Sequence, residues 1–354
     1  MQTEPRGRAA EVAGRSQAAR HHALDALRGL AALAVANYHF LFYGLNRPVQ
    51  SMGTFTVYLF FAISALTMMM VYGPRFADGI DYASASRFYR ARAARILPLL
   101  ILVSLISVTL QHSRDAAVHA YLTASGAFLL GPPGYLAIGN GTWSLGIELA
   151  FYLVFPIAAL VLARWPTRRL ALVLASSLLA QQLYLSMIGP WLAGDPLRHW
   201  DYYISPLTFA PFFLIGFLVH RLPDRTSAWA LLPMVLLLLG VVAGSLLYRP
   251  NLFTSPVAYL AFTLLVALSL VAAWRAKTPE ALRPLATFLG EISYSLYLLH
   301  WFVFIVLRKF APSLPPPAFW AAFMALSLAA AWICNRIFEV PLRRRLGTPR
   351  PAGG

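Results

Sequence analysis

Ten mainly apolar stretches, each a candidate to cross a lipid bilayer, constrain this chain of 354 residues more than any other feature. A transmembrane α-helix needs about 20 mainly apolar residues. Charged residues make up only 12% of the chain, against about 25% in soluble domains. We therefore predict an all-α polytopic integral membrane protein. The expected spans lie near residues 24–44, 54–73, 95–112, 143–163, 170–188, 206–220, 228–247, 256–274, 288–308 and 318–338.

The positions of the basic residues predict the orientation of these spans. Cytoplasmic loops of membrane proteins carry an excess of Lys and Arg. An eleventh apolar block, 116–130, would move the basic loop 164–169 to the outside if it crossed the membrane. We therefore predict that 116–130 stays at the outer face as a surface or re-entrant segment. Ten spans then leave both termini in the cytoplasm.

No internal repeat or linker divides the chain, so we predict one transmembrane domain over residues 24–341. Residues 1–23 are polar and basic and lack the apolar core of a signal peptide, which predicts a disordered cytoplasmic arm. Residues 342–354 are expected to form a cytoplasmic tail. The net charge of +16 lies largely in loops, so we expect contacts with membrane lipid and no nucleic-acid partner. One cysteine and no ligand-like histidine spacing predict no metal site.

The first span carries ionisable residues where the bilayer makes them costly. Asp25 and Arg28 are three residues apart on one helix face and are expected to pair near the inner surface. His39 follows Arg28 by about 16 Å along the helix axis, near mid-membrane. An arginine reaching to the membrane surface and a hydrogen-bonded interior histidine are the structural alternatives.

The fourth span places a carboxylate inside the membrane. Trp143 suits the interfacial belt, and Glu148 follows about 8 Å deeper. Glu148 and His39 then differ in height by about 6 Å across a core of ~30 Å. We predict that they meet and that Glu148 orients His39 for acid–base chemistry. A buried pair that only locks two helices is the alternative.

Four arginines gather within nine positions at the predicted inner surface: Arg87, Arg90, Arg92 and Arg95. The planar guanidinium group suits phosphate oxygens, so a cytoplasmic ligand carrying phosphate is predicted. The positive-inside signal or contact with anionic lipid explains the same cluster.

Other polar residues are expected in the same cavity. Ser64 is either a nucleophile or, more simply, a small residue for helix packing. His300 and Tyr297 lie near the midplane of their span, and Ser144 follows Trp143. We assign these residues to the lining of the pocket.

Five motifs in order give the chain a family resemblance. LDALRGLAALAVANYH, FFAIS, RAARILP, WSLGIELAFYLVFP and LGEISYSLYLLH follow one another, and the chain resembles the membrane-bound acyltransferase 3 family from Leu24 to Pro341. The resemblance implies ten helices with cytoplasmic ends. It also implies transfer of an acyl group, commonly acetyl, from cytoplasmic acyl-CoA to a hydroxyl of a carbohydrate outside the cytoplasm.

The resemblance assigns roles to individual residues. His39 is the general base, Glu148 supports it, and the coenzyme phosphates are held by Arg28, Arg90, Arg92 and Arg95. The chain departs from the usual family pattern at two positions of the second span. Tyr58 stands where many members have an acidic residue, and Ala65 stands where they have a glycine. A third is Ala91, which stands where many members have a second adjacent arginine.

The resemblance further implies an enzyme of the bacterial inner membrane that acts on exopolysaccharide, O-antigen or glycolipid, with glycan-assembly proteins as partners. Direct transfer and an acyl-enzyme route both remain open. Ten spans with intramembrane His, Glu and Arg also fit a proton-coupled transporter or flippase. That function is the rival hypothesis.

Overall fold

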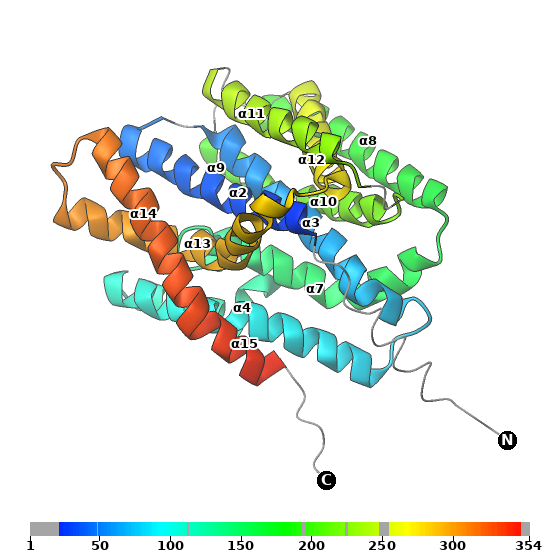
Figure 1. The fold of residues 1–354 in the computed structure, drawn as a ribbon, viewed down its shortest axis with the longest axis horizontal. Helices are drawn as coiled ribbons and strands as arrows, with labels where there is room; N and C mark the ends of the chain where they lie inside the picture. Colours follow the sequence, from blue (N-terminus) through cyan, green and yellow to red (C-terminus); the bar gives the residue numbers. More distant parts are fainter. Residues whose placement is uncertain are drawn as a thin grey trace, which may run out of the picture.

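The computed structural model describes residues 21–47, 49–111, 113–192, 195–223, 226–247 and 255–347, which form a bundle of helices (Figure 1). Within those ranges the only β pairing is an isolated bridge between Ser227 and Ala276. The α-helices are α2 (His22–His39), α3 (Gln50–Phe76), α4 (Tyr82–Gln111), α5 (Arg114–Ser125), α6 (Pro133–Leu136), α7 (Thr142–Ala163), α8 (Thr167–Leu192), α9 (Pro196–Tyr203), α10 (Pro206–His220), α11 (Leu231–Leu247), α12 (Pro256–Arg275), α13 (Arg283–Phe310), α14 (Pro316–Cys334) and α15 (Val340–Gly347). Shorter 3₁₀ and π segments cover Ala127–Leu130, Ala228–Ala230, Glu280–Leu282, Phe40–Gly44 and Asn335–Glu339.

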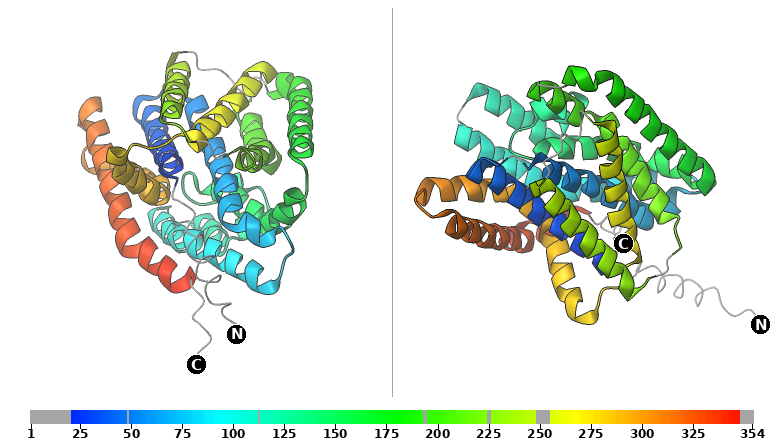
Figure 2. Two further views of the ribbon diagram at one scale, coloured as in Figure 1. Left: turned by 45° about the vertical axis from the view of Figure 1, so that its right-hand side comes forward. Right: turned by 90° about the horizontal axis from the view of Figure 1, so that it is seen from above.

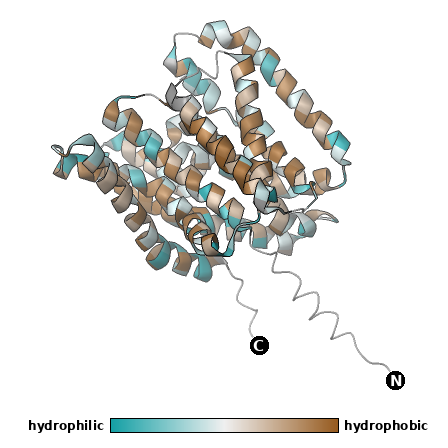
Figure 3. Cartoon of the chain, turned by 45° about the horizontal axis from the view of Figure 1, so that its top comes forward, coloured by the Kyte–Doolittle hydropathy of each residue, from teal (hydrophilic) through white to brown (hydrophobic). Residues whose placement is uncertain are grey.

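Eight helical stretches in the described part of the chain are long and apolar enough to cross a membrane. Each overlaps a span predicted from the sequence, and together they confirm an all-α polytopic membrane protein. Hydrophobic residues dominate the helical ribbons, with hydrophilic residues towards the helix ends and loops (Figure 3). The stretches are Ser51–Phe76, Tyr82–Gln111, Thr142–Ala163, Thr167–Leu192, Leu197–His220, Pro256–Arg275, Glu280–Phe310 and Pro316–Leu346.

Two of the ten predicted spans are not among these eight. The first is α2, which continues through its π segment to Gly44, and the other is α11, whose apolar part is Leu231–Gly244. The N-terminal arm up to residue 20 and the tail from residue 348 lie outside the described residues.

The block 116–130 forms a short surface helix followed by a 3₁₀ turn. Ser113 caps α5 by accepting a hydrogen bond from the Ala116 N–H, and Gly126 ends it with a left-handed φ of 79°. The 12 residues of α5 extend about 18 Å, well short of the ~30 Å core. This length agrees with the prediction that the block does not cross the membrane.

Helix α2 contacts both α3 and α13 in the middle of the bundle (Figure 2). Glycine allows the closest of these approaches. A Cβ atom at Gly29 would lie 2.4 Å from the Cβ of Leu289 on α13, and one at Gly216 on α10 would lie 2.4 Å from the carbonyl oxygen of Ala62 on α3. Small residues at such crossings let helix backbones come together in a membrane.

Gly29→Ala is therefore expected to destabilise the protein by about 1–3 kcal/mol, because overpacking forces the α2–α13 crossing apart. Gly240→Ala in α11 is the matched control, since a Cβ there meets no atom within 4 Å. Thermal unfolding in detergent should show a lower midpoint for Gly29→Ala alone. An unchanged midpoint for Gly29→Ala would contradict the tight crossing.

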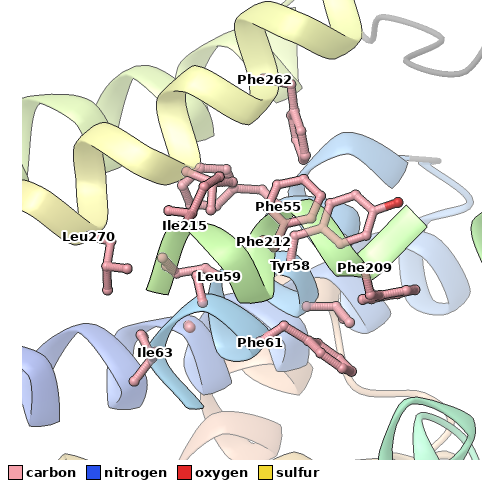
Figure 4. Close-up of a cluster of buried hydrophobic side chains, with 14 of the residues drawn as sticks. Phe55, Tyr58, Leu59, Phe61, Ile63, Phe209, Phe212, Ile215, Phe262 and Leu270 are labelled. Carbon is pink, nitrogen blue, oxygen red and sulfur yellow. The ribbon is translucent and has the colours of Figure 1, made fainter. Parts of the chain in front are cut away.

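Tyr58 is buried in the aromatic core between α3, α10 and α12 (Figure 4). Its ring stacks on Phe212 with centroids 4.1 Å apart, and Phe209 and Phe262 meet it edge-on. Ala65, the other departure on this helix, contributes to the crossing at Gly216. Both departures thus lie in helix packing.

Candidate active site

Three adjoining pockets run through the helix bundle and contain most of the predicted site residues. The first, called the His39 pocket, is lined by Tyr38, His39, Tyr43, Trp143, Tyr203 and Tyr297. The second, the Arg92 pocket, is lined by Ser64, Arg92, Arg95, Glu148, Tyr152 and Tyr297. The third, the Glu339 pocket, is lined by Arg28, Arg95, Glu291, Tyr294, Glu339 and Arg343.

Shared walls make these pockets one series. Val57 and Tyr297 line both the His39 pocket and the Arg92 pocket. Arg28 and Arg95 line both the Arg92 pocket and the Glu339 pocket. The series therefore has an aromatic end at His39 and an arginine-rich end, called the cationic end, whose arginines stand beside glutamates.

His39 occupies the end of α2, immediately before the π segment Phe40–Gly44. Such π turns are frequent at functional sites because they change the direction in which neighbouring side chains point. His39 is buried, and its Nδ1 lies 2.6 Å from Nε2 of His300 on α13. His300 is fully buried, and its Nδ1 lies 2.9 Å from the carbonyl oxygen of Leu296.

The predicted contact between His39 and Glu148 is wrong. Glu148 lines the Arg92 pocket, whereas His39 lines the next pocket along. Glu148 Oε1 instead accepts hydrogen bonds from the Ser64 hydroxyl at 2.9 Å and the Tyr152 hydroxyl at 2.5 Å. The prediction used helical rise alone, which does not specify the direction in which each side chain points around its helix axis.

Tyr297 lies between the two pockets and meets Ser144 of the Arg92 pocket. Their hydroxyl oxygens are 2.8 Å apart, and the Tyr297 hydroxyl also donates to the carbonyl oxygen of Gly141 at 3.0 Å. Gly141 precedes α7 with a φ of 83°, a conformation that favours glycine, and the Tyr297 ring occupies the space that a side chain would need. Trp143 meets Tyr203 edge-on across the His39 pocket.

Arg92 projects from α4 into the Arg92 pocket. Its guanidinium carbon lies 5.2 Å from the ring centroid of Tyr72 and 5.8 Å from that of Tyr152, and its NH2 group donates to the Tyr72 hydroxyl at 3.2 Å. The Arg92 Nε is buried and has no hydrogen-bond partner among the described residues.

Arg28 and Arg95 complete the cationic end. Arg28 is held by the carbonyl oxygen of Gly290 at 2.6 Å and by Asp25 at 3.4 Å, which confirms the Asp25–Arg28 pair. Arg90 is exposed and lines none of the three pockets. Successive helical turns direct Arg90 away from the side that carries Arg92 and Arg95, so its part in holding a ligand stays a prediction.

Glu339 and Arg343 were missed as site residues in the sequence. Glu339 is buried at the end of the π segment Asn335–Glu339 and accepts a hydrogen bond from the Ser295 hydroxyl. It shares the Glu339 pocket with Arg28, Arg95 and Arg343. The sequence feature that could have indicated Glu339 is a single carboxylate at the end of the last apolar stretch. No group of three or more His, Cys, Asp or Glu side chains in the described ranges is placed to hold a metal ion.

Comparison with known proteins decides between enzyme and transporter. A family model for acyltransferase 3 proteins, described as an acyltransferase domain, matches residues 21–336. The chain belongs to this acyltransferase family. It is therefore a multi-pass membrane acyltransferase, and the transporter hypothesis loses its basis.

Several curated proteins resemble the acyltransferase. It is 26% identical to the acyltransferase MdmB of Streptomyces mycarofaciens, over 93% of each chain. It is 31% identical to a putative membrane-bound transacylase, BcsY of Komagataeibacter xylinus, over 61% of this chain and 58% of the relative. It is 25% identical to the peptidoglycan O-acetyltransferase OatA of Listeria monocytogenes, over 91% of this chain and 55% of the relative. No solved structure matches the acyltransferase.

Proposed function

We propose that the protein transfers an acyl group, acetyl in the simplest case, from cytoplasmic acyl-CoA to a hydroxyl of a carbohydrate outside the cytoplasm. The supporting observation is the series of adjoining pockets with arginines at one end and His39 at the other. A reaction between substrates from opposite sides of a membrane requires a site that both can reach, and adjoining pockets of different character suit that requirement. The cationic end then faces the cytoplasm, together with both termini, in a bacterial inner membrane.

The arginines suit the phosphates of coenzyme A. Arg92, Arg95 and Arg28 present guanidinium groups to one space, and charge-assisted hydrogen bonds to phosphate are among the strongest available. The pantetheine arm then has to cover the rise from Arg28 to His39, about 16 Å along α2. Tyr297 and Val57 flank the point at which the thioester would pass from the Arg92 pocket to the His39 pocket.

His39 acts as the general base in this proposal. It removes the proton from the acceptor hydroxyl, whose oxygen attacks the thioester carbonyl carbon. The new C–O bond forms as the C–S bond breaks, and the proton on His39 passes to the departing coenzyme thiolate. No residue is left modified in this direct route.

An acyl-enzyme route through Ser64 is the competing mechanism. Ser64 lies in the Arg92 pocket and donates a hydrogen bond to Glu148, which is the arrangement of a nucleophile beside a base. We favour direct transfer because Glu148 also accepts from Tyr152, so that the three groups form a closed network that holds α3 against α7.

The aromatic lining of the His39 pocket supports a carbohydrate acceptor. The pocket that contains His39 is also lined by Trp143, Trp200, Tyr203, Tyr38 and Tyr43. Flat aromatic faces suit the apolar faces of sugar rings. Relatives named as peptidoglycan O-acetyltransferases point to the same class of acceptor. Envelope glycans such as exopolysaccharide, O-antigen or glycolipid fit this class, with glycan-assembly proteins as the source of the acceptor.

The test uses inverted membrane vesicles with labelled acetyl-CoA outside and envelope glycan from the native host inside. Wild-type protein should transfer label to the glycan and release coenzyme A in equal amount. Ser64→Ala should retain transfer if the direct route is correct, whereas trapped label on Ser64 would establish the acyl-enzyme. Absence of both label transfer and coenzyme release at wild-type expression would overturn the proposal.

A further inference from the structure

His39 and His300 are joined edge to edge. Their ring planes differ by 9°, and the ring centroids are 4.9 Å apart while Nδ1 of His39 and Nε2 of His300 are 2.6 Å apart. The centroid distance exceeds the nitrogen distance by about the width of one ring, so the two nitrogens lie on the line between the centroids. The rings share a plane, as a linear hydrogen bond between two imidazoles requires.

The backbone of α13 determines which imidazole donates the proton in the hydrogen bond between His39 and His300. The carbonyl oxygen of Leu296 can only accept, so Nδ1 of His300, 2.9 Å away, carries a proton. His300 is fully buried with a carbonyl and an imidazole as its hydrogen-bond partners. A charge there would lack a counter-ion, so His300 is neutral and its Nε2 accepts.

We infer that His300 is a positioning residue that holds His39 in the tautomer required of a base. Because His300 Nε2 accepts, His39 donates from Nδ1, and the lone pair of neutral His39 is on Nε2. The order Leu296 carbonyl, His300, His39 thus sets the tautomer and orientation of this imidazole, two of the tasks that the carboxylate performs in a Ser-His-Asp triad. The inference deepens the proposed function and rests on His39 acting as its base.

The fold explains why this partner comes from α13. Helices α2 and α13 approach each other closely at Gly29 and where Gly290 meets Asp25. These contacts lie towards the N-terminal ends of both helices, and the histidines lie further along them. Both helices run on from that contact, and the rise from Gly29 to His39 equals that from Gly290 to His300, about 15 Å in each. Equal spacing on two adjacent helices places the two rings at one level.

Two substitutions distinguish the hydrogen-bond acceptor atom of His300 from the space that its ring fills. His300→Phe keeps a ring and removes the acceptor, whereas His300→Gln keeps a side-chain oxygen that can accept from His39 Nδ1. We expect His300→Phe to lower kcat by at least about 10-fold, up to the 10²–10⁴-fold that a general base contributes. KM for acetyl-CoA should stay unchanged, because the arginines lie in the neighbouring pockets, and His300→Gln should recover part of kcat.

Nitrogen NMR on protein labelled with ¹⁵N-histidine reports the tautomer of His39 directly, and this signal does not depend on the stability of a variant. Wild-type His39 should show the Nδ1–H tautomer at alkaline pH, with its signal assigned by its loss in His39→Ala. The opposite tautomer in the wild type would overturn the inference even if His300→Phe failed to fold.

The outcomes distinguish this inference from the proposed function. Full kcat in folded His300→Phe, with transfer abolished in His39→Ala, would remove the positioning role and leave the base in place. Full transfer in His39→Ala would overturn the base and the positioning role together. Loss of kcat in His300→Phe with recovery in His300→Gln supports both.

Discussion

His39→Ala is expected to lower kcat for acetyl transfer by about 10²–10⁴-fold, the usual contribution of a general base. The alanine variant has no group at this position to take the acceptor proton. Binding of acetyl-CoA should persist, since Arg28, Arg92 and Arg95 are untouched. The measurement is transfer of labelled acetyl to glycan in inverted vesicles, with protein amount matched by immunoblot and acetyl-CoA binding measured in parallel.

His119→Ala is the matched control for the loss of a histidine. His119 lies on the short helix α5 and lines none of the three pockets, so its replacement should leave kcat unchanged. Equal activity of the two alanine variants would show that His39 is not the base. A failure of acetyl-CoA to bind to His39→Ala would instead assign His39 to donor binding.

Arg92→Ala should raise KM for acetyl-CoA by about 10- to 100-fold. Hydrogen bonds to charged groups contribute about 1.5–3 kcal/mol, and 1.4 kcal/mol corresponds to a factor of ten in affinity. Arg92 also packs on the rings of Tyr72 and Tyr152, so Arg92→Lys should restore the charge and only part of the affinity. Steady-state kinetics at varied acetyl-CoA concentration measures both variants.

Arg90→Ala tests whether binding of acetyl-CoA depends on the position of Arg92 in its pocket or only on the positive charge of the surface. Arg90 is two residues from Arg92 but is exposed and lies outside the pockets. Replacing either arginine by alanine lowers the net charge by the same amount. KM for acetyl-CoA should stay near the wild-type value. A rise in KM that matches that of Arg92→Ala would mean that the whole basic surface attracts the donor and that the Arg92 pocket does not select it.

The sequence by itself determined the class of the protein and most of its helices. Apolar stretches of membrane-spanning length are a local property, so eight of the ten expected spans appear directly as long apolar helices. The ordered motifs identified the acyltransferase family, which the family model confirms. Helical rise also predicted similar depths for His39 and Glu148, because rise per residue is nearly constant.

Only the tertiary structure decided which side chains meet. His39 contacts His300, 261 residues away, and Glu148 contacts Ser64, 84 residues away, in the next pocket. These partners depend on how each helix is rotated about its axis and which helix lies beside it. Glycine crossings and π turns set that rotation, and their effect on a residue in another helix cannot be obtained from spacing along one chain segment.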